Sequence, residues 1–189
     1  MKTIICITMF CAATCFAQAP QATRTVQPTI PPGGFGSTFG KPVGKMIVAQ
    51  LEAKSGSKVT GFVVFQKVGD QVLAAGALQN LKPGKHGVHI HENGDCSAPD
   101  AASAGAHFNP THQHHGGPAT EEHHAGDLGN IDADASGNAR LNWTGKLSLE
   151  GADSIIGKSL VVHEKEDDLK TDPSGNSGAR IACGVIKEQ

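Results

Sequence analysis

Histidine is concentrated in one short part of this 189-residue sequence. Ten histidines are present, and nine of them lie between positions 86 and 124. A neutral imidazole nitrogen is the commonest protein ligand for zinc and copper, because it suits borderline metals. So many imidazoles close together would be costly in a protein core unless something coordinated them. The sequence therefore predicts a metal site in this region.

The spacing of these histidines indicates two kinds of ligand set. His89 and His91 are two residues apart on a predicted strand, so both rings leave the same face. His163 ends another apolar run and could meet them only through the fold. A looser set with loop-type spacing combines three imidazoles and one carboxylate, namely His107, His115, His124 and Asp127. Such a set completes a closed tetrahedral zinc shell, which is typical of structural zinc.

Short β-strands are predicted to position these residues. Alternating or β-branched runs occupy residues 49–53, 59–66, 72–78, 128–133, 139–144, 159–163 and 181–186, and one more strand begins near His86. The 24 glycines and 10 prolines favour tight turns over long helices. Long irregular segments at 94–126 and 164–179 interrupt the strands. We expect an all-β fold, an eight-stranded antiparallel Greek-key β-sandwich or flattened barrel with two long loops, opening on a three-stranded meander.

The first 44 residues of the sequence differ in composition from the rest. Lys2, an apolar run and small residues near position 19 predict a secretory signal peptide over residues 1–19. A lipid anchor on Cys11 or Cys15 is the weaker alternative. Residues 20–44 are rich in proline and glycine and are predicted to be a flexible leader, followed by one domain over 45–189. We expect no membrane span.

The remaining cysteines and the charge limit the compartment and the partners. Removal of residues 1–19 leaves Cys96 and Cys183, and export to an oxidising compartment favours a disulfide between them over two free thiols. That bond would close a loop of about ninety residues, worth about 4–5 kcal/mol in the chain-entropy model. A formal net charge of −2 excludes a strongly basic nucleic-acid binder.

Six motifs, taken in order, resemble those of the copper–zinc superoxide dismutases. They occupy residues 87–92 (GVHIHE), 103–110 (SAGAHFNP), 115–118 (HGGP), 124–130 (HAGDLGN), 160–165 (LVVHEK) and 178–185 (GARIACGV). The resemblance covers about residues 45–189. A cysteine directly after Gly94-Asp95 is more similar to bacterial, exported members than to animal ones.

The resemblance implies the roles of specific residues. It implies copper held by His89, His91, His107 and His163, and zinc held by His107, His115, His124 and Asp127, with His107 as the bridge. It implies that Arg180 attracts the superoxide anion and that His107 carries a proton, as the catalytic residues. It also implies that the Asp167 carboxylate links His89 to His115 by hydrogen bonds.

The implied activity is antioxidant defence in the periplasm or the extracellular space. Superoxide would alternately reduce and reoxidise the His-ligated copper, giving oxygen and hydrogen peroxide, with zinc as a structural partner. A non-enzymatic copper- and zinc-binding protein on the same fold is the alternative, and a lost copper ligand would favour it. A zinc hydrolase would need an open zinc position, which the His3Asp set lacks. A homodimer is left open.

Some histidines and charges stay outside the implied site. His112, His114 and His123 are expected to be exposed loop residues, and His86 a surface residue at a strand end. Lys170 and Asp172 match no steering charges of the family.

Overall fold

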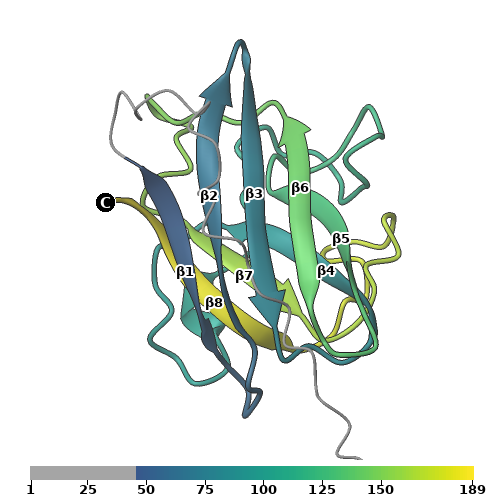
Figure 1. Ribbon diagram of the computed structural model, residues 1–189. Helices are drawn as coiled ribbons and strands as arrows, with labels where there is room; N and C mark the ends of the chain where they lie inside the picture. Colours follow the sequence, from purple (N-terminus) through teal and green to yellow (C-terminus); the bar gives the residue numbers. More distant parts are fainter. Residues whose placement is uncertain (1–45) are drawn as a thin grey trace, which may run out of the picture. The chain divides into compact units, whose positions relative to one another are not determined.

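The computed structural model describes residues 46–189, so the predicted signal peptide and leader lie outside the described residues. Eight strands form one closed antiparallel barrel (Figure 1). They are β1 (Ile47–Ala53), β2 (Thr60–Val68), β3 (Gln71–Gln79), β4 (Gly84–His91), β5 (Asp127–Ala133), β6 (Ala139–Gly145), β7 (Ser159–His163) and β8 (Arg180–Glu188). Each strand covers a predicted run, which confirms the all-β prediction. Within residues 46–189, no helix is long and apolar enough to cross a membrane.

The order of strands around the barrel is β1-β2-β3-β6-β5-β4-β7-β8. The predicted meander of β1, β2 and β3 is confirmed, but β3 then pairs with β6, as in Leu73↔Thr144, and not with β4. Pairing of β1 with β8, as in Ala49↔Ile186, closes the barrel. Figure 1 shows β2, β3 and β6 side by side, with β7, β8 and β4 crossing behind them. As a result, β5, β4, β7 and β8 are consecutive neighbours.

Burial along the strands separates the two halves of the barrel. In β2, Val63 and Phe65 are buried whereas Phe62 and Gln66 are exposed, as expected for a strand with one face in the core. All five residues of β7 are buried, as are the last six of β4. These two strands are covered on both faces, by the core inside and by the long loops outside.

Two long loops provide that cover, as predicted. The first joins β4 to β5 and contains a single 3-10 turn, η1 (Ala102–Ala104), which the sequence did not predict. The second joins β7 to β8, and its Lys165 carbonyl accepts a hydrogen bond from the Gly87 amide of β4 at 2.9 Å. The predicted disulfide between Cys96 and Cys183 is present, and it ties the first loop to β8.

His86 is a correction to the sequence prediction. It was expected at the surface, but only 2% of it is exposed. Its Nδ1 lies 2.8 Å from the His163 carbonyl oxygen, and its Nε2 lies 2.8 Å from the Lys82 carbonyl oxygen. The second loop covers this end of β4, and nothing local in the sequence reveals that cover. His112 and His114 are exposed as expected.

Candidate metal centre

Four histidines from three parts of the chain converge on one buried point. They are His89 and His91 of β4, His107 of the first loop, and His163 at the end of β7. Each offers one ring nitrogen, and these nitrogens all lie within 4.8 Å of one another. The predicted copper set is therefore brought together by the fold.

The pairing of β4 with β7 accounts for part of this convergence. His89 of β4 pairs with Val161 of β7, and His163 follows two residues later on β7. After η1 the first loop turns back along β4, where the Phe108 amide donates to the Ile90 carbonyl at 2.8 Å. That short antiparallel contact places His107 opposite His91.

Hydrogen bonds on the far side of each ring aim a free nitrogen at the common point. His91 Nδ1 donates to the Gly105 carbonyl at 2.9 Å, and His163 Nδ1 donates to the Gly178 carbonyl at 3.2 Å. His89 Nε2 lies 2.7 Å from an Asp167 oxygen. The opposite nitrogens are buried and have no hydrogen-bond partner among residues 46–189: His89 Nδ1, His91 Nε2, His107 Nε2 and His163 Nε2.

Such orphaned nitrogens are costly in a core unless they bind something. A ring whose other nitrogen donates to a carbonyl or carboxylate presents a lone pair, as a metal ligand must. Four imidazole donors suit copper. The residues present therefore fit the implied metal.

A second set of donors lies beside the first and shares His107. The predicted zinc residues His107, His115, His124 and Asp127 are all buried, and their ligand atoms lie within 4.8 Å of one another. The shared ring has Nδ1 on this side, 2.8 Å from Asp127 Oδ1, and Nε2 among the copper set.

The spacing of this second set fits zinc. The Nδ1 atoms of His107 and His124 are 3.4 Å apart, and His124 Nδ1 lies 3.3 Å from Asp127 Oδ1. His115 Nδ1 lies 3.1 Å from Asp127 Oδ2. Tetrahedral zinc with ligands at about 2.0–2.1 Å places neighbouring donors about 3.3 Å apart. The His107–His124 pair and the His124–Asp127 Oδ1 pair lie close to that separation, whereas His107 Nδ1 and Asp127 Oδ1 are closer, at 2.8 Å.

Asp167 connects the two sets. Its Oδ2 lies 2.7 Å from His89 Nε2, and its Oδ1 lies 2.9 Å from His115 Nε2. Both rings are thereby oriented with Nε2 towards Asp167 and Nδ1 towards the donors of their own set. The resemblance implied this contact, and the geometry agrees with it.

Burial keeps three rings of the first set, His89, His91 and His163, uncharged in the metal-free chain. Burial lowers the pKa of His89 to about 4 and that of His163 to about 3, and it also lowers the pKa of His91. Neighbouring imidazoles add to the effect, whereas the Asp167 hydrogen bond partly opposes it at His89. At neutral pH, the nitrogen of each of these three rings that faces the site therefore carries no proton for a metal to displace.

The second set carries charge. Burial opposes ionisation of Asp127, but hydrogen bonds from His107 and His115 hold its pKa below the usual range. Burial likewise works against a charged His115, yet its bonds to Asp127 and Asp167 raise the pKa of that ring to about 10. The negative charge of two buried carboxylates favours a cation here.

Arg180 lies at the entrance to the first set. Its two terminal nitrogens donate to the carbonyls of Ala101 and Gly105, each at 2.7 Å. The guanidinium lines a cavity of about 460 Å³ whose wall comprises His91, Ala102, Gly105, Ala106, His107, His163, Pro173, Ser174, Gly178 and Arg180. Three histidines of the predicted copper set and the positively charged Arg180 thus line one cavity, which suits a small anion.

Comparison with known proteins agrees with this geometry. Residues 59–186 match the family model described as copper/zinc superoxide dismutase. The chain belongs to this family. It is 44% identical over 140 residues to superoxide dismutase [Cu-Zn] 5 of Dictyostelium discoideum, covering 69% of this chain and 91% of that protein. It is 42% identical over 149 residues to the extracellular superoxide dismutase [Cu-Zn] of Brugia pahangi, covering 74% of each.

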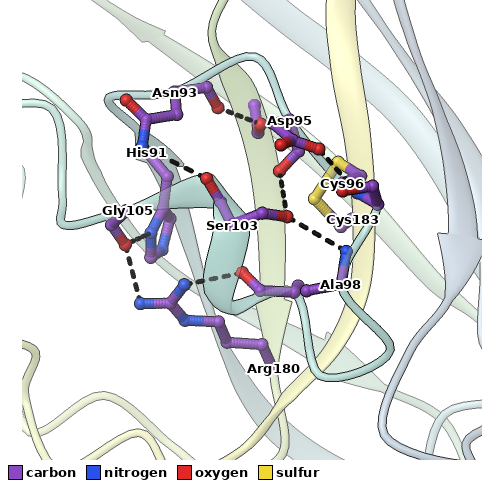
Figure 2. The surroundings of a disulfide bond; sticks show 12 residues. His91, Asn93, Asp95, Cys96, Ala98, Ser103, Gly105, Arg180 and Cys183 are labelled. Carbon is purple, nitrogen blue, oxygen red and sulfur yellow. Dashed lines mark hydrogen bonds between the residues drawn. A yellow bond between two sulfur atoms is a disulfide. The ribbon is translucent and has the colours of Figure 1, made fainter.

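In this family member, the part of the first loop that follows Cys96 supports Arg180. Figure 2 shows Ser103 between Asp95 and Ala98, next to the disulfide. Its hydroxyl donates to the Asp95 carbonyl at 2.9 Å and accepts from the Ala98 amide at 3.1 Å. These bonds fold the segment between Cys96 and η1, whose flanking residues supply the two carbonyls that hold Arg180.

Sequence reasoning missed two polar residues that support the centre. The Asn130 side chain accepts from the Asp167 amide at 2.8 Å and donates to the Asp167 carbonyl at 2.9 Å. The Asp172 carboxylate binds the His115 amide. Asn130 lies in one of the six motifs, and that motif was the only sequence feature that could have pointed to it. Asp172 had no signal, since it contacts residues far away in the sequence.

Proposed function

We propose that this chain is an exported superoxide dismutase that converts superoxide to oxygen and hydrogen peroxide. Copper and zinc are its cofactors. The observation that carries the proposal is the group of four unpartnered histidine nitrogens facing one buried point, beside a cavity that also contains Arg180. Family membership and two relatives named as superoxide dismutases support it.

The ligand assignment is part of the proposal. Copper is assigned to His89, His91, His107 and His163, and zinc to His107, His115, His124 and Asp127. The two buried clusters with convergent ligand atoms support the assignment. Only His107 belongs to both clusters, with one ring nitrogen in each.

Bound copper supplies the one-electron oxidation and reduction of superoxide, and zinc supplies a fixed positive charge. The residues of the chain do the rest. Arg180 offers a permanent cation at the cavity, and its carbonyl partners keep the planar group in place. His107 reaches the same cavity, and its Nε2 can take up a proton and pass it to a departing peroxide. Its opposite nitrogen, Nδ1, belongs to the proposed zinc set beside Asp127, so zinc held there would keep the ring in its orientation during that transfer.

Export is supported by the disulfide and by an extracellular relative. We infer a periplasmic or secreted location, and the predicted signal peptide is the feature to test by sequencing the amino terminus of the mature protein. Association into a homodimer stays a prediction. Light scattering of the purified chain measures it directly.

The test is the superoxide-consumption rate of mature protein loaded with copper and zinc or with zinc alone. We expect fast consumption only in the copper-loaded protein. His163→Ala removes one proposed copper ligand and is expected to lower the rate to the zinc-only level. His112→Ala, which removes an exposed histidine of the first loop, is the control and should keep the full rate.

Stoichiometric copper uptake without superoxide consumption would overturn the enzyme assignment and leave a metal-carrying protein. Full activity of the His163→Ala protein would instead overturn the copper assignment.

A further inference from the structure

The two long loops are joined at a carboxylate that the family resemblance did not point to. Asp172 belongs to the second loop, yet both of its oxygens bind residues of the first. Oδ1 accepts from the His115 backbone amide at 2.6 Å, and Oδ2 lies 2.6 Å from His114 Nδ1. One side chain therefore binds two consecutive residues of the other loop.

The two contacts differ in solvent exposure. The His114 side chain is 82% exposed and the Asp172 side chain 50% exposed, so that ion pair is screened by water. The bond from the His115 amide is partly buried and has an ionised acceptor, which strengthens a hydrogen bond. The backbone contact is therefore the one that constrains His115.

His115 is held from three sides. Its Nδ1 faces Asp127, its Nε2 binds Asp167, and its amide binds Asp172. The last two carboxylates belong to the same loop. That loop thus grips one proposed zinc ligand at both the ring and the backbone.

Hydrogen bonds and close packing within the second loop keep Asp167 and Asp172 in position to bind His115. Asp168 organises it, accepting from the Thr171 amide at 2.9 Å and from Asn176 Nδ2 at 2.9 Å. Gly175 has φ +62°, and any Cβ there would collide with the Asp167 carboxylate. The turn therefore packs directly behind the bond between Asp167 and His115.

The residues after Asp172 form part of the copper cavity. Pro173 and Ser174 line it, together with His163 and Arg180. Whatever fixes Asp172 also fixes the start of this wall.

We propose that Asp172 is a positioning residue that couples zinc retention to the shape of the copper cavity. It holds His115 through the backbone and, by the same contact, holds the Pro173–Ser174 wall. The inference rests on the proposed assignment of zinc to His115. Asp172 touches neither the substrate nor a metal, and acts through its neighbours.

The first measurement is the rate at which zinc-loaded protein loses zinc to a chromogenic chelator. Asp172→Ala is expected to accelerate zinc loss by on the order of tenfold, the range seen when groups behind a metal ligand are removed. Asp172→Asn keeps an oxygen that can accept the His115 amide, and should stay within about twofold of wild type. His114→Gln removes only the exposed pair and should match wild type.

A second measurement examines the cavity wall. Azide, used as a small anionic probe, is titrated into copper- and zinc-loaded protein and followed by its visible absorption. Asp172→Ala should weaken azide binding by about twofold or more, and Asp172→Asn should restore it. Glu166→Ala is the matched control in the same loop, since Glu166 pairs with Lys85 at the surface.

Loss of zinc from Asp172→Ala at the wild-type rate would overturn the inference alone. So would equal acceleration in Asp172→Asn, because the backbone acceptor would then be irrelevant. A wild-type chain that binds no zinc, or binds it unchanged after His115→Ala, would overturn the zinc assignment and this inference with it.

Discussion

At the residue scale, the Gly105 carbonyl oxygen links two functions. It accepts from His91 Nδ1 at 2.9 Å and from an Arg180 nitrogen at 2.7 Å. One oxygen thus sets the tautomer of a proposed copper ligand and also orients the cation that faces the substrate. A change that moves this carbonyl affects both.

Arg180→Lys tests the value of that orientation. Lysine keeps the charge but cannot bind two carbonyls as a planar fork, so we expect kcat/KM for superoxide to fall by on the order of tenfold. Pulse radiolysis at low salt measures it. Arg140→Lys, on the exposed face of β6, is the matched control and should leave kcat/KM unchanged. Equal rates in the Arg180→Lys and wild-type proteins would show that charge alone matters.

The pH dependence of the metal-free protein follows from its buried rings. Burial lowers the pKa of His89 to about 4 and of His163 to about 3. The unfolded chain binds these protons near pH 6.5, so folding must exclude them. The free energy of unfolding should fall by about 1.4 kcal/mol per pH unit for each ring as pH drops from 6.5 towards 4.

Chemical denaturation of chelator-treated protein at several pH values measures that slope. The carboxylates do not alter the slope between pH 6.5 and 4. Groups with a lowered pKa, such as Asp127, lose their contribution to the unfolding free energy only below about pH 3.9. His163→Leu should reduce the slope, whereas His112→Gln should not. A flat profile between pH 6.5 and 4 would contradict the prediction.

The sequence carried the proposed ligands and, through the resemblance, the supporting carboxylate Asp167, but not the rest of their support. His89 and His91 stand out because a two-residue spacing on a strand gives a common face, and the motifs supplied the rest. His86 and Asp172 were misjudged or overlooked. Their roles depend on which loop covers them, and that cover comes from residues 50 or more positions away.

At the element scale, the disulfide-bearing loop acts as a rigid part of the site. It is held by Ser103, whose hydroxyl bonds both Asp95 and Ala98, while Asn93 Nδ2 donates to the Ser103 carbonyl at 3.1 Å. The strands were predictable from alternating or β-branched runs. η1 was not, because a three-residue turn has no periodicity to detect.

Ser103→Ala tests the coupling between this loop and Arg180. Loss of two hydrogen bonds should lower the free energy of unfolding by about 1–2 kcal/mol. Because the Ala101 and Gly105 carbonyls lie on the same segment, kcat/KM should fall as well, by less than in Arg180→Lys. Denaturation and pulse radiolysis measure the two effects. Ser97→Ala, exposed in the same loop, is the control; lower stability with unchanged kcat/KM would separate the loop from the site.

At the scale of the described barrel, the disulfide connects residues 87 positions apart. We expect the double variant Cys96→Ser, Cys183→Ala to lose about 4–5 kcal/mol of unfolding free energy in the chain-entropy model. Urea denaturation measures it, and wild-type protein in reductant should fall to a similar value. A loss below about 1 kcal/mol would mean that the unfolded chain is constrained by other means.

The strand order has a consequence for variation. All proposed metal and substrate residues lie on β5, β4, β7 and β8 or on the loops between them, and these strands are consecutive around the barrel. The other half, formed by β1, β2, β3 and β6, serves as scaffold. Its outward-facing positions should therefore tolerate amino-acid substitution. The exposed hairpin at Gly69-Asp70 lies in that half. A peptide tag or an epitope grafted there should leave catalysis untouched, which makes this hairpin the natural attachment point for labelling the enzyme.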